Sequence, residues 1–162
     1  MARALIVGCG CRGRELGSRL LADGWQVRGT TREEDRRTAI EAAGLEAAVA
    51  DPDRPGTVLD QVHDIAVVVW LLGSILGEPE LIAAVHGSRL ERMLEKLVDT
   101  PVRGFVYEGS GGVQSRYLQG GAELVRQASA AWRIPVEVVE GEVADTPPGT
   151  AELAAACARV LG

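Results

Sequence analysis

The chain has 162 residues, of which 46% are hydrophobic and 25% are charged, and its formal net charge is −6. This composition is typical of a globular protein with a continuous core, and we expect one domain over residues 1–162. The negative charge argues against nucleic acid or an anionic membrane surface as the partner. The apolar stretch from Ile65 to Leu76 is shorter than the roughly 18 residues of a membrane span, and no signal peptide is expected. The expected location is the cytoplasm.

Apolar runs of strand length alternate with segments of helical periodicity along the chain. The expected strands are 3–8, 26–31, 46–50, 64–71, 102–108 and 135–140. The expected helices are 12–22, 33–43, 56–62, 80–98, 118–132 and 150–161. The fourth of these strands is apolar at every position from Ile65 to Trp70, as a parallel strand covered by helices on both faces requires. The pattern predicts an α/β protein with a doubly wound parallel sheet, a Rossmann fold, in the strand order 3-2-1-4-5-6.

The first expected strand leads directly into a glycine-rich turn with the pattern G-x-G-x-x-G. In a strand–turn–helix unit such glycines permit the tight turn, the approach of phosphates to the backbone, and close helix–strand contact. The free N–H groups at the start of the helix attract the anion. We therefore expect a dinucleotide pyrophosphate at Gly8, Gly10, Cys11, Arg12 and Gly13. The alternative is a glycine turn that only reverses the chain.

The residues at the end of the second expected strand bear on the choice between NAD and NADP. That strand ends at Thr31, and the next residue is Arg32. Proteins that prefer NAD usually place a carboxylate at this strand end to bind the ribose hydroxyls, and none stands there. A guanidinium at Arg32, assisted by Arg12, would bind a 2′-phosphate. Glu33 fits NAD by its distance from Gly13 in the sequence, but we assign it to the first turn of the next helix. NADP is the expected cofactor, with NAD the less favoured alternative.

Two further loops follow expected strands. Asp51 either accepts a hydrogen bond from the adenine amino group or forms a turn. Leu72 and Gly73 would let the backbone approach the inner ribose and the nicotinamide, with a plain loop as the alternative. Cys9 and Cys11 are interpreted as small side chains that fill the glycine turn, and no metal site is expected.

Several segments, in this order, resemble the extended and atypical short-chain dehydrogenase/reductases, a group that includes NAD(P)-dependent sugar-nucleotide epimerases. They are the glycine turn and the segments 29–32, 50–51, 105–110 and 131–136. The resemblance implies a catalytic Ser at the end of the fifth strand and a Tyr-x-x-x-Lys pair on the next helix. Ser110 matches the Ser position, and Tyr117 is the candidate Tyr. Gly121 stands where the Lys would be, and the single lysine of the chain, Lys96, lies on the preceding helix.

Two functions remain open. Without an adjacent cation a tyrosine hydroxyl stays protonated at neutral pH, so the Tyr–Lys mechanism is not expected. One hypothesis is an NADPH-dependent reductase of an unknown small molecule, with Ser110, Tyr117 and Tyr107 near the nicotinamide. The other is a non-catalytic NADP(H)-binding sensor or regulatory subunit that acts on a protein partner. Exposed apolar residues from Leu81 to Leu97 or on the last helix would indicate a homodimer, with a place in the core as the equal alternative for these residues.

Overall fold

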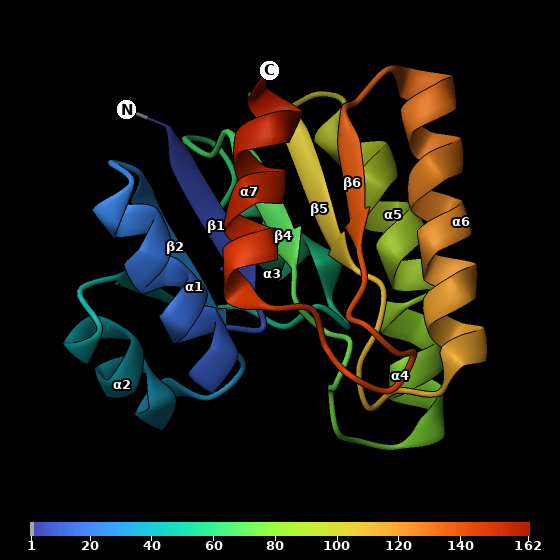
Figure 1. The fold of residues 1–162 in the computed structure, drawn as a ribbon, viewed down its shortest axis with the longest axis horizontal. Coiled ribbons are helices and arrows are strands. Elements are labelled where there is room, and N and C mark those ends of the chain that lie inside the picture. Colours follow the sequence, from blue (N-terminus) through green and yellow to red (C-terminus); the bar gives the residue numbers. More distant parts are fainter. Residues whose placement is uncertain (1) are drawn as a thin grey trace.

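The computed structural model describes residues 2–162 and contains a six-stranded sheet with helices on both faces (Figure 1). The strands are β1 (Arg3–Val7), β2 (Gln26–Thr31), β3 (Glu46–Val49), β4 (Val67–Trp70), β5 (Gly104–Glu108) and β6 (Val136–Val139). They are all parallel, in the order β3-β2-β1-β4-β5-β6. The predicted fold class and strand order are confirmed, and the order reverses between β1 and β4.

The helices cover the two faces of the sheet as separate layers. They are α1 (Cys11–Ala22), the 3-10 helix η1 (Glu34–Arg36), α2 (Arg37–Ala42), α3 (Pro55–Leu59), α4 (Pro79–Val85), α5 (Ser88–Leu97), α6 (Ser115–Trp132) and α7 (Thr150–Leu161). Because side chains alternate along a strand, Ala4 and Ile6 of β1 pack with α1, α2 and α7, whereas Leu5 and Val7 pack with α3 to α6. Figure 1 shows α1 and α7 in front of the sheet and α5 behind it.

Strand β4 lies at the centre of the sheet, and all its residues are buried, as its uninterrupted apolar sequence predicts. In the described residues, 2–162, no helix has both the length and the apolarity to cross a membrane. The large exposed apolar side chains of this part of the chain are Leu21, Val49, Leu76, Val98, Trp132 and Val143. None of them lies within 81–97 or on α7, so these segments give no support to the homodimer, which stays a prediction.

The helix expected at 80–98 is two helices, α4 and α5, with a break at His86 and Gly87. Gly87 has a non-helical backbone, and a Cβ there would lie 2.7 Å from the carbonyl oxygen of Ala83. The carbonyl oxygen of Val85 accepts a hydrogen bond from Nε1 of Trp70 at 3.0 Å. The apolar periodicity continues across the break, so the pattern gives no sign of it. The segment expected as a helix at 33–43 is likewise divided, into η1 and α2.

A charge network joins the strands on the β2 side of the sheet. Arg28 is 4% exposed, and its guanidinium donates to the two carboxylate oxygens of Asp64 at 2.7 and 2.9 Å. It also donates to Glu46 at 3.1 Å, and Arg3 donates to Asp64 at 2.5 Å. Hydrogen bonding from Arg28 lowers the pKa of Asp64 to about 2, and the charges of Arg28 and Arg3 act in the same direction. This network fixes β1, β2 and β3 to the segment that precedes β4.

We expect Asp64→Asn to lower the free energy of unfolding at neutral pH by about 1–2 kcal/mol, a figure that allows for the partial exposure of Asp64. Because the pKa of Asp64 is lower in the folded chain than in the unfolded one, its ionised carboxylate stabilises the fold above about pH 4. That contribution disappears as the pH falls toward about 2. In urea unfolding experiments, the difference in free energy of unfolding between wild type and Asp64→Asn should therefore become smaller as the pH is lowered over this range.

The exposed ion pair of Glu34 and Arg37 provides the control for this measurement. Glu34→Gln should change the free energy of unfolding by less than about 0.5 kcal/mol at any pH. A difference between wild type and Asp64→Asn that stays constant with pH would contradict the role given to the Asp64 carboxylate.

Candidate functional site

The glycine turn joins β1 to α1 beside the point where the strand order reverses. Gly8 has a φ of +89°, and a Cβ there would lie 2.7 Å from the carbonyl oxygen of Leu71. Gly13 lies against the strand, where a Cβ would be 3.3 Å from Ile6. At Gly10, by contrast, a Cβ would meet nothing within 4 Å. Packing within the protein therefore requires glycine at Gly8 and favours it at Gly13, whereas Gly10 faces open space that a ligand can enter.

The first turn of α1 supplies hydrogen-bond donors to this open space. No side chain caps the helix at Gly10, and its first turn holds no acidic residue. The N–H groups of Cys9 and Gly10 are used inside the turn, donating to the carbonyl oxygens of Thr30 and Gly8 at 2.9 Å. The N–H groups that follow, from Cys11 to Gly13, lie in the first turn of α1, where backbone N–H groups have no acceptor within the helix. This arrangement suits an anion such as a phosphate.

The two cysteines of the turn differ in environment. Cys9 is buried between α1 and β2, with its sulfur close to Gly13 and Gly29. Burial raises the pKa of the Cys9 thiol to about 12, so the thiol stays protonated at neutral pH. Cys11 is exposed at the start of α1. Cys9 therefore fills space in the turn, as expected from the sequence, whereas the same expectation for Cys11 is wrong because its side chain is exposed.

Strand β2 ends at Thr31, as predicted, and the side chain of Arg32 is exposed directly after it. Within residues 2–162, Arg32 has no ion-pair partner. Glu33 has an extended backbone and immediately precedes η1, so its expected place in the first turn of the helix is wrong by one residue. Its carboxylate accepts a hydrogen bond from Nε of Arg36 at 2.8 Å. The guanidinium of Arg32 is thus free to meet a ligand, whereas the carboxylate of Glu33 is engaged by a neighbour.

Asp51 forms a turn after β3. Its Oδ1 accepts a hydrogen bond from the N–H of Asp53 at 2.9 Å, and its own N–H donates to the hydroxyl of Thr57 at 2.8 Å. The structure therefore shows the turn, which is one of the two roles expected for Asp51. The contact with adenine stays a prediction.

Arg12 points away from Arg32. Its Nη1 donates to Oε2 of Glu108 at 2.5 Å, and its Nη2 donates to the carbonyl oxygen of Pro148 at 2.7 Å. Glu108 ends β5, which is separated from β2 by β1 and β4. The expectation that Arg12 assists Arg32 at a single 2′-phosphate is therefore wrong for this structure. The physical reason is that a buried carboxylate attracts the guanidinium to the other side of the turn.

Glu108 is not among the site residues expected from the sequence. It is 1% exposed, and its Oε1 accepts a hydrogen bond from the N–H of Gly73 at 2.7 Å. Burial raises the pKa of the Glu108 carboxyl, and the guanidinium of Arg12 opposes that rise. The sequence does contain a sign that Glu108 has a specific role: it is a carboxylate at the end of an otherwise apolar strand. Such a group is costly to bury unless it is paired.

The loops that follow β4 and β5 pack against each other. Gly73 accepts a hydrogen bond at its carbonyl oxygen from the N–H of Val113 at 2.9 Å. A Cβ at Gly73 would lie 2.6 Å from the carbonyl oxygen of Ser110. The carbonyl oxygen of Leu72 is bonded to His86 at 2.9 Å. The backbone of Leu72 and Gly73 is thus engaged by other parts of the chain.

The two candidate catalytic hydroxyls have separate partners. Ser110 is 2% exposed, and its Oγ donates to the carbonyl oxygen of Thr146 at 2.7 Å and accepts from the N–H of Gly141 at 2.6 Å. Tyr117 is half-buried in the first turn of α6, and its hydroxyl accepts a hydrogen bond from Arg116 at 2.9 Å. In the described residues no hydrogen bond joins Ser110 to Tyr117.

Gly121, at the position that corresponds to the family's Lys, lies against the hydroxyl group of buried Tyr107. A Cβ at Gly121 would collide with Oη of Tyr107 and lie 2.6 Å from its Cζ. Tyr107 Oη and His86 Nδ1 are 2.7 Å apart. Burial lowers the pKa of His86, so the ring is neutral, accepts from Tyr107 and donates from Nε2 to Leu72. The buried pair of Tyr107 and His86 thus occupies the space that the side chain of a lysine at position 121 would enter.

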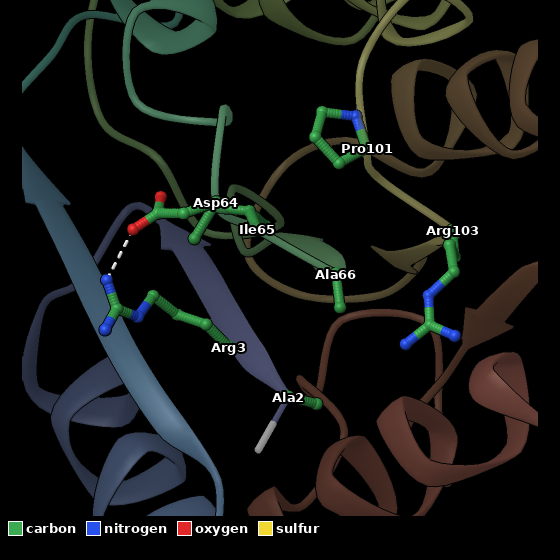
Figure 2. A pocket seen from close by; sticks show the side chains of 7 residues that line it. All are labelled: Ala2, Arg3, Asp64, Ile65, Ala66, Pro101 and Arg103. Atoms are coloured by element: carbon green, nitrogen blue, oxygen red, sulfur yellow. Dashed lines mark hydrogen bonds and ion pairs between the residues drawn. The ribbon is translucent and has the colours of Figure 1, made fainter.

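A hollow of about 390 Å³ lies at the opposite edge of the sheet, where the strands begin (Figure 2). Its lining residues are Ala2, Arg3, Asp64, Ile65, Ala66, Pro101 and Arg103. Figure 2 shows Arg3 bonded to Asp64 on one side and Arg103 on the other. None of the site residues expected from the sequence lines this hollow. The candidate site is therefore the carboxyl edge of the sheet, at the glycine turn.

No protein-family model and no curated protein matches this sequence. The structure is similar to that of a short-chain dehydrogenase/reductase superfamily protein from Agrobacterium tumefaciens with bound NAD, with a TM-score of 0.68 and 22% identity over 85% of this chain and 48% of that one. It is also similar to UDP-glucose 4-epimerase from Thermotoga maritima, with a TM-score of 0.70 and 13% identity over 85% and 54% of the two chains. Vestitone reductase from alfalfa gives a TM-score of 0.63 and 16% identity over 86% and 56%.

The chain spans about half the length of these solved structures. All the identities are low, so the similarity concerns the fold. The chain therefore has the Rossmann fold found in short-chain dehydrogenase/reductase structures, in agreement with the resemblance of its sequence segments.

Proposed function

We propose that this protein binds NADP(H) at the carboxyl edge of its sheet, with the pyrophosphate on the glycine turn and the 2′-phosphate on Arg32. The observation that carries the proposal is Gly10. It faces open space at the start of α1, between Gly8 and Gly13, whose surroundings leave little or no room for a side chain. The bound NAD named for the Agrobacterium protein supports a nicotinamide dinucleotide as the ligand class.

The choice of NADP over NAD rests on the residues after β2. Arg32 is exposed, and within the described part of the chain it forms no ion pair, whereas the carboxylate of Glu33 is bonded to Arg36. An exposed guanidinium can bind a phosphate through paired, charge-assisted hydrogen bonds. Glu33 is the alternative ligand, because a carboxylate near this strand end binds the ribose hydroxyls of NAD and the exposed pair that Glu33 forms with Arg36 is weak.

The chemistry of the site favours binding without turnover, as in a redox sensor or a regulatory subunit. The position for the catalytic Lys is Gly121, which has no room for a side chain, and both hydrogen-bonding roles of the Ser110 hydroxyl are used within the protein. The second candidate is an NADPH-dependent reductase, favoured by the half-buried Tyr117 as a proton donor. Bound NADPH would supply the hydride, and steady oxidation of NADPH by an aldehyde or quinone would support this candidate.

We expect Gly10→Ala to weaken NADP binding by about tenfold or more, because the added methyl group would occupy the space proposed for the phosphates. The free energy of unfolding should fall by no more than about 1 kcal/mol, because nothing in the chain contacts that methyl group and alanine is only a poorer N-cap than glycine. Isothermal titration calorimetry and urea unfolding measure the two effects. Gly120→Ala, on α6 and also in open space, is the matched control. An unchanged Kd in folded Gly10→Ala would contradict the proposed phosphate position.

Arg32→Ala should weaken binding of NADP by about 10- to 100-fold and leave the binding of NAD nearly unchanged, because only NADP has the 2′-phosphate. Calorimetric titration with each dinucleotide gives the comparison. Arg126→Ala removes an exposed arginine from α6 and controls for the change in net charge. Equal losses of affinity for the two dinucleotides would show that Arg32 does not bind the 2′-phosphate.

The close contact of Gly121 with Tyr107 predicts that Gly121→Ala lowers the free energy of unfolding by about 1–3 kcal/mol or more through overpacking. Gly120→Ala, one position earlier on the same helix, should be neutral or stabilise the chain by up to about 1 kcal/mol. Adding Tyr107→Phe removes the colliding hydroxyl and should recover part of the loss in Gly121→Ala. If Gly121→Ala unfolds at the same urea concentration as Gly120→Ala, the space at this position is open and a lysine there would be tolerated.

A further inference from the structure

An ion pair crosses the carboxyl edge of the sheet between the first turn of α1 and the end of β5. Nη1 of Arg12 lies 2.5 Å from Oε2 of Glu108, and the two side chains are 31% and 1% exposed. Strand β4 lies between β1 and β5, and the second oxygen of Glu108 is bonded to Gly73, which follows β4. The pair therefore spans the end of β4. It lies in the half of the carboxyl edge that is formed by β4, β5 and β6.

The segment 140–149, between β6 and α7, is attached to the same side of the edge (Figure 1). The carbonyl oxygen of Pro148 accepts a hydrogen bond from Arg12 at 2.7 Å. Ser110 holds the segment at Gly141 and Thr146, and the N–H of Gly111 donates to it at the carbonyl oxygen of Ala144 at 3.2 Å. Polar groups that would otherwise face a ligand at the ends of β4 and β5 are thus bonded to the protein itself.

The side formed by β1, β2 and β3 is different. Gly10 faces open space there, and Arg32 is exposed after β2. In a doubly wound sheet each half binds one nucleotide of a dinucleotide, and the crevice between them lies where the strand order reverses. Groups beside the half for the adenosine are exposed, whereas groups beside the half for the nicotinamide are bonded to one another through the Arg12–Glu108 pair and segment 140–149.

We propose that the Arg12–Glu108 pair makes the site selective for the adenosine part of its ligand, so that the protein recognises 2′-phosphorylated ADP-ribose and leaves the nicotinamide unbound. The proposal rests on the function proposed above and narrows it to one half of the dinucleotide. We assign this selectivity to the ion pair, because Arg12 connects the glycine turn both to Glu108 and to Pro148. Breaking the pair frees the end of β4 for the nicotinamide ribose.

The test compares NADP with 2′-phospho-ADP-ribose by isothermal titration calorimetry on the wild-type protein and on Glu108→Gln. The wild type should bind the two ligands with Kd values within about threefold of each other, because the nicotinamide adds no contact. Glu108→Gln keeps an acceptor for the N–H of Gly73 but removes the charge that holds Arg12. It should raise the affinity for NADP about tenfold more than that for 2′-phospho-ADP-ribose, because the effect of the lost charge on the shared pyrophosphate applies equally to both ligands.

Glu137→Gln breaks the more exposed ion pair of Glu137 and Arg159 and should leave both affinities at the wild-type values. If Glu108→Gln does not fold, the double variant Arg12→Met/Glu108→Gln removes both charges together and leaves no unpaired buried charge. Wild-type binding of NADP more than about tenfold tighter than that of 2′-phospho-ADP-ribose would overturn this inference and leave the proposed function standing. An unchanged ratio of affinities in the folded variant would also overturn it. Binding of neither ligand to the wild type would overturn both proposals.

Discussion

Strand β5 ends in a carboxylate, that of Glu108, which is almost completely buried, and a charge in that position must be paired. Its partners are the backbone N–H of Gly73 and the guanidinium of Arg12. This need explains why the loop after β4 is held close to the loop after β5, and why Arg12 turns toward β5 rather than β2. Through Arg12, the same carboxylate also fixes segment 140–149 at Pro148.

The carboxyl edge consequently has two unlike halves. Near β1 and β2 the turn is open at Gly10 and an exposed arginine follows the strand, and the proposed binding of a phosphorylated adenosine rests on these two features. Near β4 and β5 the polar groups are bonded to one another, and Tyr107 occupies the space next to Gly121. Catalysis by a Tyr–Lys pair would require room in this second half. This arrangement is the basis on which we propose recognition of a nucleotide rather than chemistry on a substrate.

The fold was predictable from the sequence because its signals are local: apolar runs, helical periods and a glycine turn each depend on neighbouring residues. The end of β2 at Thr31 and the glycine turn were placed correctly for the same reason. The direction of Arg12 was not predictable, because its partners Glu108 and Pro148 are distant in sequence. The break at His86 and Gly87 has a local signal, the glycine, but the apolar periodicity that continues across it favoured one helix. The collision between Tyr107 and Gly121 likewise joins a strand to a helix that the sequence pattern treats separately.

The most direct measurement is the change in backbone amide chemical shifts of the ¹⁵N-labelled protein on addition of NADP. The largest changes should fall on the amides from Gly10 to Gly13 and on Arg32, where the phosphates are proposed to bind. Changes concentrated instead at Arg3, Asp64 and Arg103, around the hollow at the opposite edge, would contradict the central claim that the glycine turn binds the pyrophosphate. A spectrum that does not change at millimolar NADP would contradict it equally.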